Sequence, residues 1–225
     1  IPGHGTAPSG LTTVMWQDMA AAVELAMRHM RKKMGDKPVY IVGYSNGGAL
    51  AVNYSLSALQ NPELPSAKGL FLMSPEIGVT AAAAFAVWQA RLGHLLGLNK
   101  LEWNTLLPEF DPYKYGSFAV NAGDLAYRLT SAIQDKFDAL DAEQLKKFPP
   151  VLAFQSAVDA TVEANALVHN LFNRLPVNEH ELVIFDINRL TNIQYILAKD
   201  PGPGIDTLLR KPELSFAVSV LTNVS

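Results

Sequence analysis

The pentapeptide Gly43-Tyr44-Ser45-Asn46-Gly47 constrains this chain more than any other segment. Residues 38–42 before it are largely β-branched or aromatic and predict a buried strand, whereas residues 48–59 carry alanine, leucine and valine at helical spacing. A strand joined to a helix through G-x-S-x-G forms a nucleophile elbow, a turn so tight that Ser45 must adopt a strained backbone conformation. The alternative is a chance glycine-serine turn, and the flanking strand and helix argue against it.

The elbow predicts particular roles for its residues. We expect glycine at positions 43 and 47 because a side chain at either would collide with the neighbouring strand or helix. The strain directs the hydroxyl of Ser45 outward, and the start of the following helix presents backbone N–H groups to an incoming oxyanion. The pattern therefore predicts Ser45 as a nucleophile and the backbone N–H of Asn46 as an oxyanion donor.

Composition argues against several other functions. The net charge of -3, from 18 basic and 21 acidic residues, gives no reason to expect nucleic acid or an anionic membrane as partner. The absence of cysteine excludes disulfides, thiolate metal sites and a cysteine nucleophile. No apolar run is long enough to span a bilayer, and the 5 histidines form no pair at metal-ligand spacing. We expect no cofactor, no metal and no transmembrane segment, and nothing in the sequence assigns a compartment.

Buried strands alternate with helices along most of the chain. Apolar patterning predicts helices at 11–34 and about 46–60, and strands at 38–43, 69–73, 151–155, 181–186 and 215–221. Strands separated by helices imply right-handed crossovers. The expected fold is thus α/β, with a mostly parallel sheet and helices on both faces.

Residues 77–148 interrupt this alternation. The segment is too long for a single crossover, and it is rich in aromatic residues, helical patterns and prolines. We interpret it as a mostly helical cap over the carboxyl edge of the sheet, inserted into a core formed by 1–76 and 149–225. A pair of additional core helices is the alternative.

At this point the chain resembles the α/β-hydrolase superfamily, and within it the capped esterases, monoacylglycerol lipases and serine aminopeptidase-like proteins. The resemblance rests on four segments, namely Pro2-Gly3-His4-Gly5, Trp16-Gln17-Asp18, residues 39–48 with the elbow, and Ser156 to Val162. It implies a Ser-acid-His triad in which Ser45 is the nucleophile. The last of these segments looks like the acid loop of the family.

The acid of the triad has two candidates. Asp159 follows the carboxyl end of a predicted strand, the edge where catalytic groups gather in open parallel sheets. Asp186, at the end of the next strand, is the reserve candidate and is otherwise a structural turn residue. A buried carboxylate in this role orients the histidine that takes the serine proton.

The histidine base is not found where the resemblance requires it. The superfamily order places it after the acid, where only His169 and His180 occur, the first on a helix and the second at the amino edge of its strand. Earlier histidines lie in the opening turn, in a helix and in the cap; these are His4, His29 and His94. We therefore expect a fragment truncated at both ends, with the catalytic histidine beyond Ser225 and part of the oxyanion hole before Ile1.

The leading functional hypothesis is hydrolysis of carboxylic esters through an acyl-serine intermediate. An alternative is a serine aminopeptidase or amide hydrolase, in which carboxylates recognise a free amine; the candidates are Glu76, Glu102, Glu109 and Asp111, which otherwise form a solvated face. A third alternative is a non-catalytic α/β-hydrolase-fold binding protein. The expected partner in the first case is a small ester or acyl substrate.

Overall fold

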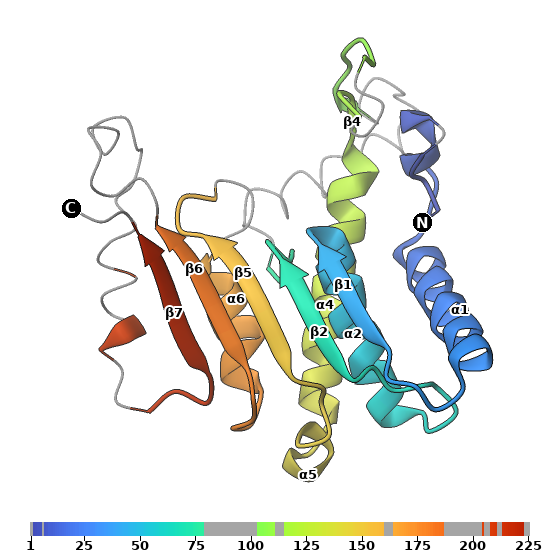
Figure 1. Ribbon diagram of the computed structural model, residues 1–225. Helices are drawn as coiled ribbons and strands as arrows, with labels where there is room; N and C mark the ends of the chain where they lie inside the picture. Colours follow the sequence, from blue (N-terminus) through green and yellow to red (C-terminus); the bar gives the residue numbers. More distant parts are fainter. Residues whose placement is uncertain are drawn as a thin grey trace.

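The computed structural model describes residues 2–5, 7–78, 103–110, 115–159, 164–186, 204, 208–210 and 213–222. Its centre is a five-stranded parallel sheet (Figure 1). The strands lie in the order β1 (Tyr40–Tyr44), β2 (Gly69–Met73), β5 (Val151–Ser156), β6 (Glu181–Asp186) and β7 (Ala217–Thr222). A separate antiparallel pair joins β3 (Trp103–Thr105) to β4 (Phe118–Ala119). The predicted strands 69–73 and 181–186 are confirmed at both ends.

The described helices are α1 (Trp16–Met34), α2 (Asn46–Gln60), α4 (Val120–Ala139), α5 (Ala142–Leu145) and α6 (Ala164–Asn170), with 3-10 turns η1 (Pro8–Leu11) and η3 (Phe172–Arg174). The helix predicted at 46–60 is confirmed. The helix predicted from residue 11 begins only at Trp16. The backbone N–H of Met15 donates to Asp18 Oδ2 at 2.9 Å, which caps the helix at that point.

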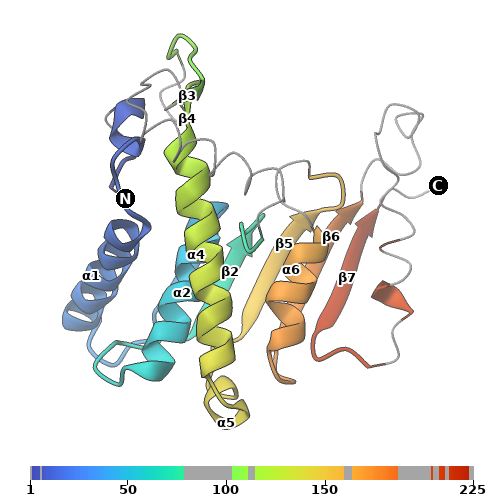
Figure 2. The same ribbon diagram turned by 180° about the vertical axis from the view of Figure 1, so that it is seen from behind.

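Helices α2, α4 and α6 cover one face of the sheet (Figures 1 and 2). The strands neighbour one another in chain order, so right-handed crossovers place the connecting helices on the same side. Helix α1 lies beside the β1 edge, where it contacts α2 and α4. The predicted parallel sheet is confirmed, and within the described residues the predicted helical cover is confirmed for one face only.

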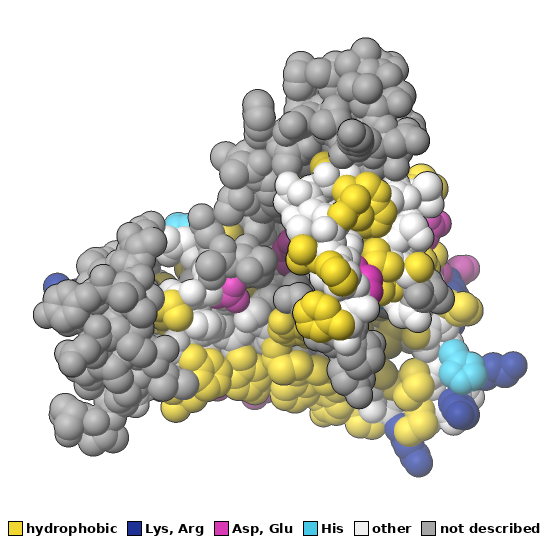
Figure 3. Space-filling view, turned by 90° about the horizontal axis from the view of Figure 1, so that it is seen from above, with side chains coloured by type: hydrophobic (Ala, Val, Ile, Leu, Met, Phe, Trp, Pro, Cys, Tyr) yellow, Lys and Arg dark blue, Asp and Glu magenta, His cyan; other side chains and the backbone are white. Residues whose placement is uncertain are grey.

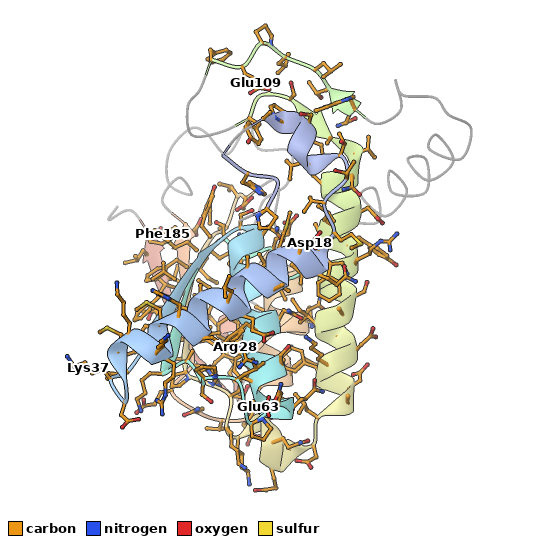
Figure 4. The ribbon with its side chains drawn as sticks, turned by 90° about the vertical axis from the view of Figure 1, so that its right-hand side faces the viewer. Asp18, Arg28, Lys37, Glu63, Glu109 and Phe185 are labelled. Atoms are coloured by element: carbon orange, nitrogen blue, oxygen red, sulfur yellow. The ribbon has the colours of Figure 1, made fainter. Side chains whose placement is uncertain are left out.

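The opposite face of the sheet carries exposed apolar side chains. Tyr40, Val42 and Tyr44 of β1 alternate with residues that face the helices, and Phe71 and Met73 do the same on β2. Figure 3, viewed from above, shows hydrophobic side chains in a row along this side. Phe185 of β6, labelled in Figure 4, lies on the side of the sheet away from α4. We refer to Tyr40, Val42, Tyr44, Phe71 and Met73 as the bare face.

Helix α4 belongs to the core. It packs against α2, and its buried residues Leu125, Leu129, Ile133 and Phe137 join the hydrophobic cluster that contains Leu72. Helix α4 lies within the predicted cap range 77–148, but it packs in the core as part of the crossover between β2 and β5. Residues 79–102 and 111–114 of the range lie outside the described residues, so a helical cap stays a prediction.

The β3–β4 hairpin lies beyond the amino end of α4, on the carboxyl side of the sheet (Figure 1). Asn121 Nδ2 donates to the backbone oxygens of Leu11 at 2.8 Å and Val14 at 3.0 Å, which ties α4 to the N-terminal segment. The rings of His4 and Tyr115 stack with centroids 6.5 Å apart. These contacts hold the opening turn and the hairpin together on the same side as the elbow.

Candidate active site

Ser45 lies between the end of β1 and the start of α2, as an elbow requires. Its backbone has φ 52° and ψ -123°, a region that residues other than glycine rarely occupy. Such a conformation costs about 1–3 kcal/mol and persists only when the surrounding contacts enforce it. The predicted strained turn is therefore present at this residue.

Backbone hydrogen bonds from β2 and its following loop enforce that conformation. The N–H of Ser45 donates to the carbonyl of Met73 at 3.0 Å. The carbonyl of Ser45 accepts from the N–H of Gly48 at 2.9 Å and from the N–H of Glu76 at 3.0 Å. The turn at Ser45 is consequently held by its own helix and by the end of the neighbouring strand.

The glycines of the elbow differ in how closely other segments approach them. A Cβ atom at Gly43 would lie 2.7 Å from the carbonyl oxygen of Gly47 and 2.7 Å from Cα of Gly48, so the predicted collision exists there. The same prediction for Gly47 is wrong, because a Cβ at that position meets no atom of the described residues within 4 Å apart from its chain neighbours and the backbone of its own helix. The second close approach is at Gly48, where a Cβ would lie 2.6 Å from Cβ of Pro75. Gly43 and Gly48 thus permit the tight turn.

Asn46 is the first residue of α2. The first N–H groups of an α-helix have no intrahelical acceptor and carry the positive end of the helix dipole. The N–H of Asn46 is among these groups, which suits the oxyanion role predicted for it. Its side chain serves another purpose, since Nδ2 lies 3.5 Å from Sδ of Met19 and packs the elbow against α1.

Asp159 lies at the same edge of the sheet as Ser45, in the turn after β5. Strand β2 separates the two, since Tyr44 pairs with Met73 and Met73 pairs with Phe154. Two strand spacings amount to about 10 Å, which leaves room for an imidazole between the serine and the carboxylate. Oδ2 of Asp159 accepts a hydrogen bond from Gln155 Nε2 at 3.3 Å.

Asp186, the reserve acid, is one strand further away. It is the last residue of β6 and is buried, with 3% of its surface exposed. Its backbone oxygen accepts from Thr222 Oγ1 at 2.9 Å, so it also links β6 to β7. This contact fits the structural turn role predicted as its alternative.

Glu76 is one of the four carboxylates that the sequence analysis considered for amine binding. It follows β2 through Ser74 and Pro75, and its N–H donates to the carbonyl of Ser45. Burial raises the pKa of its carboxyl group above the usual value. Of the carboxylates grouped with it, Glu109 is elsewhere, on the hairpin (Figure 4), where it accepts from the N–H groups of Gly116 and Ser117. These hydrogen bonds lower the pKa of Glu109. Glu102 and Asp111 lie outside the described residues.

The described histidines occupy the positions that the sequence suggested. His29 lies within α1 and His169 within α6. His180 is buried at the amino edge of the sheet, where Nδ1 accepts from the N–H of Val151 at 3.1 Å, and burial lowers its pKa to about 4. His4 is exposed in the opening turn. None of these four follows a strand at the carboxyl edge.

Two features are absent from the described residues, namely a metal-binding cluster and a membrane-spanning helix. Across the described ranges, no cluster of three or more histidine or acidic side chains could hold a metal ion. Within the same part of the chain, no helix combines the length and apolar character needed to cross a membrane.

Known proteins share this architecture. One solved structure comes from a report on LipS and LipT, two metagenome-derived lipolytic enzymes. It is 18% identical to this chain, with 93% of this chain and 80% of that chain covered and a TM-score of 0.58. The monoacylglycerol lipase of Paleococcus ferrophilus is 15% identical, with 87% and 76% covered and a TM-score of 0.51. These likenesses show the α/β-hydrolase fold.

Sequence comparison supplies the family. No curated protein matches this chain closely enough to count as a relative. The family model described as serine aminopeptidase, S33 (Hydrolase_4), matches residues 1–188, which include the elbow and the acid loop. With Ser45 in its strained turn and Asp159 at the same sheet edge, the chain belongs to the serine aminopeptidase S33 family of α/β-hydrolases.

Proposed function

We propose that the protein hydrolyses carboxylic esters through an acyl-serine intermediate. The observation that carries the proposal is the backbone of Ser45, held at φ 52° between β1 and the amino end of α2. A non-glycine residue is kept in such a conformation only where the surrounding structure enforces it, and such sites cluster where strain serves function.

In the proposed reaction the hydroxyl oxygen of Ser45 attacks the ester carbonyl carbon while a histidine takes its proton. The resulting oxyanion is stabilised by the N–H of Asn46 at the positive end of α2. The intermediate collapses with loss of the alcohol, which receives the proton, and water then releases the acid. Asp159 orients the histidine, and that histidine lies outside the described residues.

An acyl or other apolar substrate group fits the proposal best. Two solved proteins of the same fold are described as a lipolytic enzyme and a monoacylglycerol lipase. The hairpin on the carboxyl side of the sheet also presents apolar side chains, with Trp103 half-buried and Leu106 and Phe110 exposed. Amide hydrolysis is a second candidate, because the half-buried Glu76 follows β2 and its backbone N–H donates to the carbonyl of Ser45, which puts an acidic residue next to the elbow.

The test uses the full-length gene product with any residues that flank positions 1–225. Wild-type protein should react with a fluorophosphonate and hydrolyse short p-nitrophenyl esters faster than aminoacyl anilides, whereas Ser45→Ala should abolish labelling and turnover. Ser74→Ala is the matched control, because Ser74 also has a positive φ, 42°, but the described residues 75–78 that follow it are not helical.

The outcomes separate the alternatives. Retained turnover in Ser45→Ala contradicts the nucleophile assignment. Faster hydrolysis of the anilides favours the aminopeptidase, and a folded wild-type protein that neither reacts nor turns over favours a binding scaffold.

A further inference from the structure

Gln155 is a polar residue in an otherwise apolar position. It lies on β5 one residue before the end of the strand, and none of its surface is exposed. The other residues of β5 that face the helices are Val151 and Ala153, and both are buried. Burying an amide costs free energy unless its polar atoms are hydrogen-bonded, so an apolar residue would serve packing better.

The amide of Gln155 is directed to the proposed acid. Nε2 lies 3.3 Å from Oδ2 of Asp159 and 3.4 Å from the backbone oxygen of Ser156. The turn that carries Asp159 is itself fixed, because the N–H of Asp159 donates to the oxygen of Ser156 at 3.3 Å. The N–H of Ala157 donates to the carbonyl of Phe185 at 3.0 Å, which anchors the turn to β6.

A neutral amide donor suits a carboxylate that must stay ionised and keep one orientation. It stabilises the charged form without the counter-charge of a lysine or arginine, which would compete with the imidazolium that forms during the reaction. Because Gln155 is locked within the sheet, it transmits the rigidity of β5 to a side chain on the loop.

We propose that Gln155 is a positioning residue that orients the carboxylate of Asp159 toward the catalytic histidine. The inference rests on the proposed function for its catalytic consequence, and on the hydrogen bond alone for its structural one. This separation allows each part to be tested without the other.

The first experiment needs no activity. In the full-length protein labelled with nitrogen-15, the side-chain amide signals of Gln155 are followed from about pH 7 to about pH 3. They should shift with a titration that Asp159→Asn removes and Asp186→Asn leaves in place. Signals that are insensitive to the Asp159 substitution overturn the proposal, whatever the enzyme does.

The second experiment measures the effect on turnover. Gln155→Met removes the donor at nearly constant shape and should lower kcat per folded molecule by about tenfold to hundredfold, with KM little changed. Val151→Ala is the matched control: it weakens the same buried face of β5 at its other end, away from the carboxyl edge. It should leave kcat per folded molecule unchanged.

A third variant remains informative if Gln155→Met does not fold. Gln155→Glu is nearly isosteric and places a second carboxyl group against Asp159, so the acid limb of the rate profile should move to higher pH. An unmoved pH profile in Gln155→Glu, or an unchanged kcat in folded Gln155→Met, overturns the positioning role. Turnover retained in Ser45→Ala would instead reject the proposed function, while the amide titration would still decide the hydrogen bond.

Discussion

The two elbow glycines provide a matched pair of substitutions four residues apart. In Gly43→Ala, the new Cβ would lie 2.7 Å from the oxygen of Gly47, 2.7 Å from Cα of Gly48 and 2.8 Å from N of Gly48. All three neighbours are backbone atoms in the first turn of α2, so relief requires the helix to move. Overpacking of this kind costs about 1–3 kcal/mol of unfolding free energy.

The same movement should displace Ser45, the proposed nucleophile. The carbonyl of Ser45 is bonded to the N–H of Gly48, and Asn46 begins the helix that must shift. A misplacement near 1 Å at a reacting centre lowers the rate about hundredfold. We therefore expect Gly43→Ala to lose both stability and fluorophosphonate reactivity.

Gly47→Ala should behave in the opposite way. Apart from its chain neighbours and the backbone of its own helix, no atom of the described residues lies within 4 Å of its Cβ position; its φ is not positive, and it is part of α2. Alanine in a helix is more favourable than glycine by about 0.5–1 kcal/mol. Urea denaturation and the rate of fluorophosphonate labelling, measured on both variants, test these expectations. Equal effects of the two substitutions, or a Gly43→Ala protein as stable as wild type, would refute the reasoning.

Three further predictions concern stability and association. Burial lowers the pKa of His180 from its ordinary value of 6.5 to about 4, so the unfolded chain binds a proton that the folded chain does not. The free energy of unfolding should therefore fall by about 3 kcal/mol as the pH drops from about 6.5 to about 4. Urea titrations should show this loss, and a flat profile would contradict it. Tyr54→Phe removes a 2.5 Å hydrogen bond to the carbonyl of Pro65 and should lower the free energy of unfolding by about 1–2 kcal/mol. The control Tyr40→Phe, on the bare face, should lower it by less than about 0.5 kcal/mol. Residues 1–225 expressed alone should bind a hydrophobic dye through the bare face. The double substitution Val42→Thr and Phe71→Thr should reduce both dye binding and the self-association seen by light scattering. No reduction would mean that another surface is responsible.

The strands and the elbow could be predicted because their signals are local. The run Gly69 to Met73 is apolar and bounded by polar and proline residues, and the strand has those bounds. The strain at Ser45 follows from the strand, turn and helix that surround it in the sequence. Both inferences needed no knowledge of what packs against these segments.

Contacts between distant segments could not be predicted in this way. The spacing of Leu125 and Leu129 shows an apolar helix face, but it does not say whether that face meets a core or a cap. The letters of the elbow likewise do not reveal that Pro75 approaches Gly48 rather than Gly47. The hydrogen bond of Gln155 to Asp159 required the turn after β5 to fold back toward the strand.

The single direction of the strand order has a consequence for how the molecule can be shielded. Crossovers through α2, α4 and α6 all add to the same layer, so none of them can reach the apolar side of β1 and β2. Shielding that side is a task for polypeptide that does not link these neighbouring strands. The turn at Ser45, by contrast, is held by Met73, Glu76 and its own helix. Substitutions at Val42 or Phe71 should therefore change the hydrophobicity of the bare face and leave the contacts that hold Ser45 intact.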